Sequence, residues 1–383
     1  MKSKQNILFI TSWFPSKANS TLGNFVKWHA LALSLYSNIS IIYVAKLPHL
    51  KSKFVSEKET LNNLDISIMY YKGADTGVNT LNKIINSVNH FRAYQKLFTL
   101  VKPKPDMVHA NIVWPIGMFA LWLKFRYKLN FILTEHWSAL SKKENFNFLK
   151  RTLIRIIFKN ADFIIPVSES LKNDIKKWND KLAFKVIPNI VNTEYFYFKE
   201  KTLSNTYKWV HISTLEPVKN VEGIILAFSK LIHYNSNNHL SIISDGNYSS
   251  IKRLILELKI PDNNIRLIGT STNQDVANLL RNSDACIQFS RSETFGIVAA
   301  EALCTGTPLL STKVGFLDGF FEEEIGLFVE SENTEELFRK MKLMPDLKFD
   351  KLKSSIYFSS LFKPKKISQT YSEIYRKLSN TKK

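Results

Sequence analysis

Two glutamates at a fixed spacing are the residues of this chain that are best suited to chemistry. Glu293 and Glu301 are separated by seven residues, and Gly296 between them lets a ligand approach the backbone closely. At about 100° per helical residue, eight steps end about 80° past two full turns, so both carboxylates can lean toward one side. Free N–H groups at a helix start bind anions. The pattern therefore predicts a phosphate on the backbone amides and sugar hydroxyls on the carboxylates.

A strand, a loop and a helix must position these two carboxylates. Residues 285–289 form an apolar run and predict a strand. Residues 290–294 are polar and suit a loop with an N-cap, and residues 295–304 are good helix formers. Gly306 and Pro308 end the predicted helix. The sequence thus predicts a helix N-terminus shortly after a strand, which is a local geometry that binds anions.

A plainer interpretation of the same pair is that Glu293 caps the helix while Glu301 is solvated. The neighbours of Glu301 argue against it, because the other residues of 298–303 are all apolar. Such surroundings are unusual for a surface glutamate. The context therefore favours a functional glutamate at this position.

The motif S-x-x-E-T-F-G-I-V-A-A-E-A-L-x-x-G-T-P-L-L-S-T at residues 290–312 resembles the signature of family-four retaining glycosyltransferases. The resemblance implies the two-domain GT-B architecture: an α/β fold of two doubly wound, Rossmann-like domains facing a cleft. It also implies that Glu293 contacts the transferred sugar and that Glu301 holds the ribose hydroxyls of a nucleotide. The backbone amides of Phe295, Gly296 and Ile297 are implied to bind sugar and phosphate.

A second segment departs from the family pattern at one position. The family usually has an arginine and a lysine five residues apart that clamp the diphosphate of the donor. Lys219 matches the lysine, whereas Thr214 stands in place of the arginine. A neutral hydroxyl replaces a bidentate cation, so the diphosphate is expected to depend more on Lys219 and on the helix amides. Without the family, Lys219 would be interpreted as a solvated lysine at a helix start.

The first half of the chain offers three further candidates. His136 follows the strand predicted at 130–134, where α/β sheets bind ligands. A lone histidine is more often structural, but the resemblance implies that His136 lies near the reacting sugar, with His109 as the second choice. Gly23 lies in the loop after the first strand, where the family places a glycine-bearing loop at the cleft. The first βα turn lacks G-x-G-x-x-G, which argues against a dinucleotide site there.

The positive charge of the chain is concentrated in one half. Residues 1–200 carry 29 Lys and Arg against 13 Asp and Glu, a net +16, whereas residues 201–383 carry 24 against 20, a net +4. Such a field attracts an anionic membrane face, a phosphorylated substrate or nucleic acid. A Lys- and Asn-rich composition could also raise the charge with no dedicated partner. The many aromatic residues favour lipid headgroups or a glycan, and no nucleic-acid module is recognisable.

The remaining composition indicates an ordinary globular protein of 383 residues, 45% hydrophobic, with room for two domains. Cys286 and Cys304 lie in apolar segments and are interpreted as core residues in a reducing compartment. No Cys/His cluster has zinc spacing, and no metal or other cofactor is expected. The N-terminus lacks the pattern of a signal peptide. We expect a cytoplasmic protein that can rest on the inner face of the membrane, with the basic helix of residues 151–160 facing the lipid.

The predicted organisation has three parts. Residues 1–200 form an N-terminal, acceptor-side Rossmann-like domain, and residues 201–362 form the nucleotide-sugar-binding domain. Residues 363–383 form a terminal helix that crosses back to the N-terminal domain in GT-B enzymes. Within the first domain, residues 46–64 are interpreted as a polar, basic loop and residues 185–192 as the last strand.

The function implied by the resemblance is a metal-independent retaining hexosyltransferase. It would move a sugar from a nucleotide-sugar donor to a glycan or lipid-linked acceptor in surface polysaccharide synthesis. Another GT-B nucleotide-sugar enzyme, such as an epimerase, is the first alternative, and it would need no acceptor. A non-catalytic polyanion-binding protein is the second, and its binding would be sensitive to salt and independent of Glu293.

Overall fold

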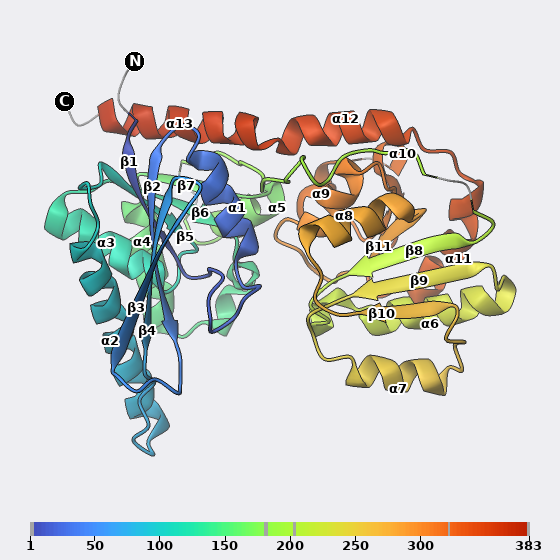
Figure 1. The fold of residues 1–383 in the computed structure, drawn as a ribbon, viewed down its shortest axis with the longest axis horizontal. Coiled ribbons are helices and arrows are strands. Elements are labelled where there is room, and N and C mark those ends of the chain that lie inside the picture. Colours follow the sequence, from blue (N-terminus) through green and yellow to red (C-terminus); the bar gives the residue numbers. More distant parts are fainter. Residues whose placement is uncertain (1–3, 180–182, 202–203, 321, 381–383) are drawn as a thin grey trace. The chain divides into compact units, whose positions relative to one another are not determined.

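The chain folds into two compact α/β units, each built on its own sheet, as the sequence predicts (Figure 1). The computed structural model describes residues 4–179, 183–201, 204–320 and 322–380. The first unit contains Met1–Ile190 and Pro364–Lys383, and the second contains Val191–Lys363. The last residues of the predicted terminal helix, 381–383, lie outside the described part of the chain. The acceptor-side and donor-side roles of the two domains stay predictions.

The first unit has a seven-stranded sheet in the order β3-β4-β2-β1-β5-β6-β7. All neighbouring strands are parallel except β3 and β4, which are antiparallel. The central strands are continuously buried runs, as expected for parallel strands covered on both faces. The strands are β1 (Asn6–Thr11), β2 (Asn38–Lys46), β3 (Phe54–Leu61), β4 (Leu64–Tyr71), β5 (Met107–Asn111), β6 (Phe131–Glu135) and β7 (Phe163–Pro166).

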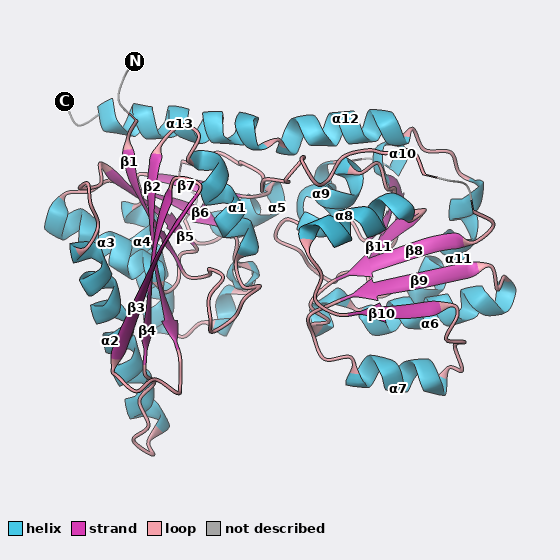
Figure 2. Ribbon diagram, in the orientation of Figure 1, coloured by secondary structure: helices cyan, strands magenta, loops and turns pink. Residues whose placement is uncertain are grey.

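Helices cover both faces of this sheet, with α1 on one face and α2 and α3 on the other (Figures 1 and 2). The final helix, α13, packs beside α1. The helices of the first unit are α1 (Asn24–Leu33), α2 (Asn79–Thr99), α3 (Ile116–Tyr127), α4 (Phe148–Asn160), α5 (Glu169–Lys176) and α13 (Pro364–Asn380). Within the described residues, no helix combines the length and the apolar character that crossing a bilayer requires.

The second unit has a six-stranded parallel sheet in the order β10-β9-β8-β11-β12-β13. Its strands are β8 (Tyr207–Ile212), β9 (Asn238–Ile243), β10 (Ile265–Ile268), β11 (Ala285–Gln288), β12 (Leu309–Ser311) and β13 (Gly326–Phe328). Its helices are α6 (Val221–Tyr234), α7 (Ser249–Glu257), α8 (Asn273–Asn282), α9 (Ile297–Cys304), α10 (Glu322–Ile325), α11 (Thr334–Leu343) and α12 (Lys351–Phe362). Because β8 pairs with β11, the loops that follow these two strands meet at one edge of the sheet.

Two local predictions were wrong. Residues 46–64 are not only a loop, because Phe54–Leu61 pair with Leu64–Tyr71 as the antiparallel edge strand β3. The polar side chains of β3 suit an exposed edge strand. Because most of its residues are polar, the sequence pattern did not predict a strand here. Residues 185–192 form no strand, because they make only two backbone hydrogen bonds to β7, and Pro188 cannot donate a further one.

Helix α13 is fixed to the first unit by a buried hydrogen-bonded group. The Nδ1 atom of His109 lies 2.6 Å from the Tyr375 hydroxyl, and its Nε2 atom lies 2.7 Å from Thr134 Oγ1. The Tyr371 hydroxyl lies 3.1 Å from the same Thr134 oxygen. All four side chains are fully buried. His109, the second choice for a functional histidine, therefore uses both ring nitrogens to hold α13 to the sheet.

We predict that Tyr375→Phe lowers the free energy of unfolding by about 1–3 kcal/mol, because His109 Nδ1 then loses its partner inside the core. Urea unfolding followed by tryptophan fluorescence measures the change. Tyr357→Phe, which alters an exposed tyrosine of α12, is the matched control and should have almost no effect. Equal losses for the two variants would contradict the structural role given to His109.

Candidate functional site

The motif of residues 290–312 folds into β11, a loop, α9 and β12, as the sequence predicts, but the helix starts later than expected. Helix α9 begins at Ile297 and not at Phe295. Gly296 is the N-cap in the left-handed conformation, with φ 88° and ψ 60°, and no side chain caps the helix. Phe295 is held out of the helix because its ring is buried and its carbonyl accepts a hydrogen bond of 3.0 Å from Phe316 N.

The first turn of α9 presents free backbone donors. The N–H groups of Ile297, Val298 and Ala299 have no acceptor among the described residues, and the first bond of the helix runs from Ala300 N to Gly296 O at 3.2 Å. With no capping side chain, these N–H groups and the positive end of the helix dipole can receive an anion. Of the predicted amides at Phe295, Gly296 and Ile297, only the last lies within the helix.

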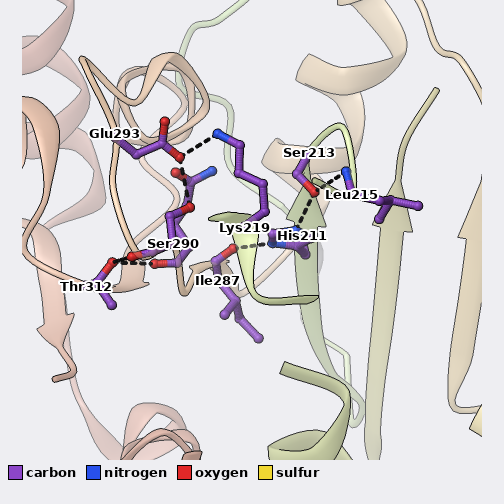
Figure 3. Close-up of polar contacts among 9 residues, drawn as sticks. His211, Ser213, Leu215, Lys219, Ile287, Ser290, Glu293 and Thr312 are labelled. Carbon is purple, nitrogen blue, oxygen red and sulfur yellow. Dashed lines mark hydrogen bonds and ion pairs between the residues drawn. The ribbon is translucent and has the colours of Figure 1, made fainter. Parts of the chain in front are cut away.

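Two predicted site residues, Lys219 and Glu293, are in direct contact. Lys219 Nζ donates to Glu293 Oε1 at 2.6 Å, and Ser290 Oγ donates to the same oxygen at 2.8 Å (Figure 3). Both charged side chains are largely buried, with 21% and 13% of their surface exposed. Glu293 therefore does not cap α9. Its second oxygen, Oε2, has no hydrogen-bond donor among the described residues and can accept one from a ligand.

The loop that carries Lys219 is held from two sides. It follows β8 and contains the short 3₁₀ helix Pro217–Lys219 before α6 begins. Arg291 N donates to Val218 O at 2.8 Å, and the Arg291 guanidinium contacts Pro217 O and the Glu332 carboxylate. Arg291 is a positioning residue that sequence reasoning missed, because its contacts with Pro217 and Val218 join segments more than 70 residues apart.

His211 is a second positioning residue that the sequence did not indicate. Its Nδ1 atom lies 2.8 Å from Ile287 O, and its Nε2 atom lies 2.8 Å from Ser213 Oγ, so it ties β8 to β11 next to Lys219 (Figure 3). Burial lowers the pKa of His211 to about 4, and the positive charge of Lys219 also lowers it. The ring is therefore neutral at physiological pH and adds no charge to the site.

Thr214, in the position where the family has arginine, is exposed and lies at the start of the same loop. The next residue, Leu215, has a left-handed backbone with φ 58°, and its N–H donates to Ser213 Oγ at 3.3 Å. Gly246 accommodates this turn, because a Cβ there would lie 2.6 Å from Thr214 O. The structure thus places a hydroxyl, and no charge, at this point of the loop.

Glu301 lies on α9 with a half-buried side chain that forms no hydrogen bond within the described part of the chain. Burial raises its pKa to about 8. The thiols of Cys286 and Cys304 are buried beside it, and burial raises the pKa of each of them, with a smaller contribution from Glu301. An unsatisfied carboxyl group in such surroundings is suited to accept hydrogen bonds from a polar ligand.

The first unit holds the other two predicted site residues at the carboxyl end of its sheet. His136 follows β6 and is buried, and neither ring nitrogen has a partner among the described residues. Burial lowers its pKa well below 6.5, and His29 lowers it further. The ring packs on Phe25 of α1, with centroids 4.7 Å apart. His136 is therefore a neutral imidazole with free hydrogen-bonding capacity.

Gly23 is the N-cap of α1, with φ 73°. A Cβ at this position would lie 2.5 Å from the carbonyl carbon and oxygen of Trp13. The space beside Gly23 is thus filled by the backbone of the loop that it closes. The glycine positions the entrance of α1, two residues before Phe25, rather than leaving an opening of its own.

Sequence reasoning also missed Glu135, a buried carboxylate next to His136. Glu135 accepts backbone hydrogen bonds from Val113 N at 2.7 Å, from His136 N at 2.9 Å and from Trp137 N at 2.8 Å. Burial raises its pKa to about 7, and these three hydrogen bonds oppose the increase. Glu135 thereby joins the loop after β5 to the loop after β6 and fixes the backbone of His136.

The loop after β5 is strained and polar. Ile112 has φ 71°, which is rare for a β-branched residue, and its N–H donates to Thr134 O at 2.9 Å. The preceding Asn111 is fully buried, and neither atom of its amide has a partner among the described residues. Asn111 and His136 together place unused neutral donors and acceptors at this edge of the sheet.

The second unit therefore combines a paired cation, free helix amides and two carboxylates, and the first combines neutral hydrogen-bonding groups. The described residues contain no group of three or more His, Cys, Asp or Glu arranged to hold a metal ion. Two α/β units on mainly parallel sheets, with candidate ligand-binding groups at the carboxyl ends of their strands, fit the GT-B architecture that the sequence predicts. Comparisons with known proteins identify the class.

Two family models match adjacent parts of the chain: "Glycosyltransferase Family 4" over residues 76–195 and "Glycosyl transferases group 1" over residues 194–355. The protein belongs to this family of glycosyltransferases. An uncharacterized glycosyltransferase of Methanocaldococcus jannaschii is 28% identical over 324 residues, which cover 78% of this chain and 86% of the relative. The N-acetyl-alpha-D-glucosaminyl L-malate synthase of Bacillus anthracis is 26% identical, over 70% of this chain and 74% of that protein.

Solved structures show the same fold. Sucrose-phosphate synthase from Thermosynechococcus elongatus superimposes with a TM-score of 0.81 at 16% identity, covering 99% of this chain and all of that chain. HepE of Anabaena, solved in complex with UDP-glucose, has a TM-score of 0.70 at 15% identity, covering 97% of this chain and 99% of that one.

We predict that Glu301→Gln changes how stability depends on pH. The folded protein holds the Glu301 proton more tightly than the unfolded chain does, so the stability contributed by this group falls as pH rises from 4.5 toward 8. The variant removes this loss, and its Tm should be close to that of the native protein near pH 5 and higher near pH 8.5. Thermal unfolding across this range measures the effect.

Glu257→Gln, which changes an exposed glutamate of α7, is the control for losing a carboxylate. It should leave the shape of the pH profile unchanged. If Glu301→Gln shifts the Tm equally at both ends of the pH range, this result would contradict the raised pKa of Glu301 in the folded protein.

Proposed function

We propose that the protein is a retaining glycosyltransferase that transfers a sugar from a nucleotide-sugar donor to a glycan or lipid-linked acceptor without a metal ion. The observation that carries this proposal is the contact between Lys219 and Glu293 beside the uncapped start of α9. It joins one cation, one carboxylate and a set of free amides in a single place. These are the groups needed to hold a diphosphate and the sugar attached to it.

Donor binding is assigned to the second unit. The three hydrogens of the Lys219 ammonium allow it to contact a phosphate oxygen while it keeps Glu293, and the free amides of α9 supply further donors. Glu293 Oε2 accepts from a hydroxyl of the sugar, and Glu301 accepts from the ribose. HepE, which shares the fold, was solved with UDP-glucose, and this supports a nucleotide-sugar as the class of donor.

We propose a transfer step that uses these groups and proceeds on one face of the sugar. The bond between the sugar C1 and the phosphate oxygen breaks, and its electron pair stays on the nucleoside diphosphate. Lys219 and the α9 amides stabilise the charge that develops there through fixed electrostatics. The acceptor oxygen bonds to C1 on the face that the phosphate leaves, and its proton passes to a phosphate oxygen. The configuration at C1 is therefore retained.

Acceptor binding is assigned to the first unit. His136 is neutral and Asn111 has free amide atoms, so both suit hydroxyl groups better than charged ones. Gly23 contributes by setting the start of α1 beside Phe25 and His136.

The acceptor is proposed to be presented at a membrane. One relative, of Streptococcus pneumoniae, is named alpha-monoglucosyldiacylglycerol synthase, and this name and the net charge of +16 on residues 1–200 support that setting. Synthesis of a surface polysaccharide at the inner face of the membrane is the setting we propose.

The first test is thermal stability in the presence of nucleotide-sugars and nucleoside diphosphates with a chelator. A donor at about 100 times its Kd should stabilise the protein by about 2.7 kcal/mol, which raises the Tm by several degrees. Glu301→Ala should weaken binding of this donor by about tenfold or more, because the hydrogen bonds between the ribose and this carboxyl group are lost. Glu257→Ala should respond like the native protein. A shift that appears only when a divalent metal is added would contradict metal-independent binding.

The second test is the reaction with the donor thus identified. An α-linked donor should give an α-linked product, as followed by proton NMR of the anomeric signal. Lys219→Ala should lower kcat/KM by about 10²–10³-fold, because it removes charge stabilisation at the leaving group. Lys252→Ala, which alters an exposed lysine of α7, is the matched control. A β-linked product would exclude retention, and nucleotide-sugar conversion without acceptor would favour an epimerase.

A further inference from the structure

Three helices of the first unit form one layer on the sheet, which we call the basic layer: α2, α3 and α4. The rings of Phe98 in α2 and Tyr127 in α3 have centroids 4.9 Å apart. Helix α3 meets α4 at Gly117, where an added Cβ would lie 2.7 Å from Ile157 Cγ2. The three helices are thus in continuous contact, on the face of the sheet opposite α1 (Figure 1).

The basic layer contains no Asp or Glu. The 21 residues of α2, the 12 of α3 and the 13 of α4 hold three, two and four Lys or Arg. At the overall frequency of 33 Asp and Glu in 383 residues, about four carboxylates would be expected in these 46. Of the nine cations, Lys124 pairs with Asp162 at 2.7 Å, and none of the other eight forms an ion pair within the described residues. Helix α5 of the same unit, by contrast, pairs both of its carboxylates with lysines.

The same layer exposes large apolar side chains. Phe148 and Leu149 at the start of α4 are 77% and 67% exposed, which is unusual for two adjacent large hydrophobic residues. Ile156 lies two turns further along the same face of α4. The exposed apolar residues of the layer are Leu81, Ile84, Val88, Phe125, Tyr127, Phe148, Leu149 and Ile156. A charged, acid-free surface with apolar side chains standing on it is typical of helices that lie in a membrane interface.

The first turn of α4, which carries Phe148 and Leu149, is stabilised by a cap and by cation–π contacts. Asn147 caps the helix by accepting from Lys150 N at 2.9 Å. The ammonium of Lys150 lies 4.6 Å from the ring centroid of Phe146 and 4.9 Å from that of Trp137. The cap and the cation–π contacts thus stabilise the first turn of α4, while the side chain of Phe148 is exposed to solvent.

A group of cations that form no ion pair with any described carboxylate lies beside this turn. Burial lowers the pKa of Lys143, and the neighbouring guanidiniums of Arg155 and Arg151 lower it further. The Nε atom of Arg151 is buried and has no partner among the described residues. Arg155 and Lys159 are exposed on the same side of α4 as Phe148. Mutual repulsion among these cations would be relieved by an anion, and an array of phosphate headgroups supplies many.

We propose that the basic layer is the surface by which this protein docks on an anionic lipid bilayer, with Phe148, Leu149 and Ile156 of α4 inserted among the headgroups. This inference deepens the membrane setting of the proposed function and rests on it. Five of the eight exposed apolar residues are aliphatic and offer no ring on which a base could stack, which favours a bilayer over nucleic acid. The layer lies on the membrane and does not cross it.

The test is flotation of the full-length protein with vesicles of phosphatidylcholine containing 30% phosphatidylglycerol, without donor or acceptor. The native protein should bind these vesicles, should bind less in high salt, and should bind pure phosphatidylcholine weakly. Phe148→Gln, Leu149→Gln and Ile156→Gln combined should weaken binding by about tenfold or more, because three apolar side chains no longer leave water. Lys83→Glu, Arg126→Glu and Arg155→Glu combined should abolish it.

Matched triple variants of the second unit control for surface chemistry. Leu256→Gln, Leu352→Gln and Ile356→Gln remove equally exposed apolar residues, and Lys252→Glu, Arg253→Glu and Arg339→Glu change charge by the same amount. Both controls should bind vesicles like the native protein, and all variants should keep its Tm. Native-level vesicle binding by the apolar variant of α4 would overturn the proposal. The proposal would also be overturned if single-stranded DNA displaced the vesicles from the native protein and the apolar variant still bound both DNA and vesicles.

The outcome is independent of the enzymatic assays. A protein that binds anionic vesicles but responds to no nucleotide-sugar would disprove the proposed reaction and leave the docking surface in place. A protein that transfers sugar but ignores the vesicles would disprove the docking surface alone.

Discussion

The contact between the Lys219 ammonium and the Glu293 carboxylate is the interaction on which the site of the second unit depends. It exists because β8 and β11 are neighbours in a parallel sheet, so the loops after them emerge at the same edge. His211 ties the two strand ends together and Arg291 ties the two loops, which leaves the ion pair little freedom to separate. A largely buried ion pair of this kind is costly to break on one side only. A ligand is therefore expected to bind beside the contact, through the remaining hydrogens of Lys219 and through Glu293 Oε2, without breaking it.

Burial sets the charge of the other site residues. Glu301 and Glu135 are both glutamates with raised pKa, but they differ in how their oxygens are used. Glu135 accepts three backbone hydrogen bonds and fixes loops, whereas Glu301 has no partner among the described residues and remains available. His136 and His109 show the same division in the first unit. His136 is neutral and has no hydrogen-bond partner among the residues that the structure describes, whereas His109 is neutral and hydrogen-bonded through both ring nitrogens. Structural groups differ from candidate functional ones less in residue type than in whether their hydrogen-bonding atoms already have partners among the described residues.

The doubly wound design keeps two kinds of surface apart in the first unit. The carboxyl ends of the strands collect polar groups such as Asn111 and His136, because loops there are released from the sheet. The faces of the helices are free to vary, since only their inner stripes pack on the strands. In α2, α3 and α4 the outer stripes combine cations with apolar residues. A ligand-binding edge and a docking face can thus coexist in one domain without competing for the same residues.

The sequence by itself determined the α/β class and the strand, loop and helix around Glu293, because these depend on apolar runs and helix-ending residues that lie close together in the chain. It also singled out Glu301 through the motif, and Lys219 through a second segment that resembles the family. Only the tertiary structure decided that Lys219 pairs with Glu293, that Glu135 joins the loop after β5 to the loop after β6, and that residues 185–192 form no strand. Each of these depends on contacts between segments distant in the chain or on the supply of backbone partners, and local patterns do not encode either of them. The start of α9 at Ile297 has the same cause, since the burial of Phe295 against Phe316 overrides its helix propensity.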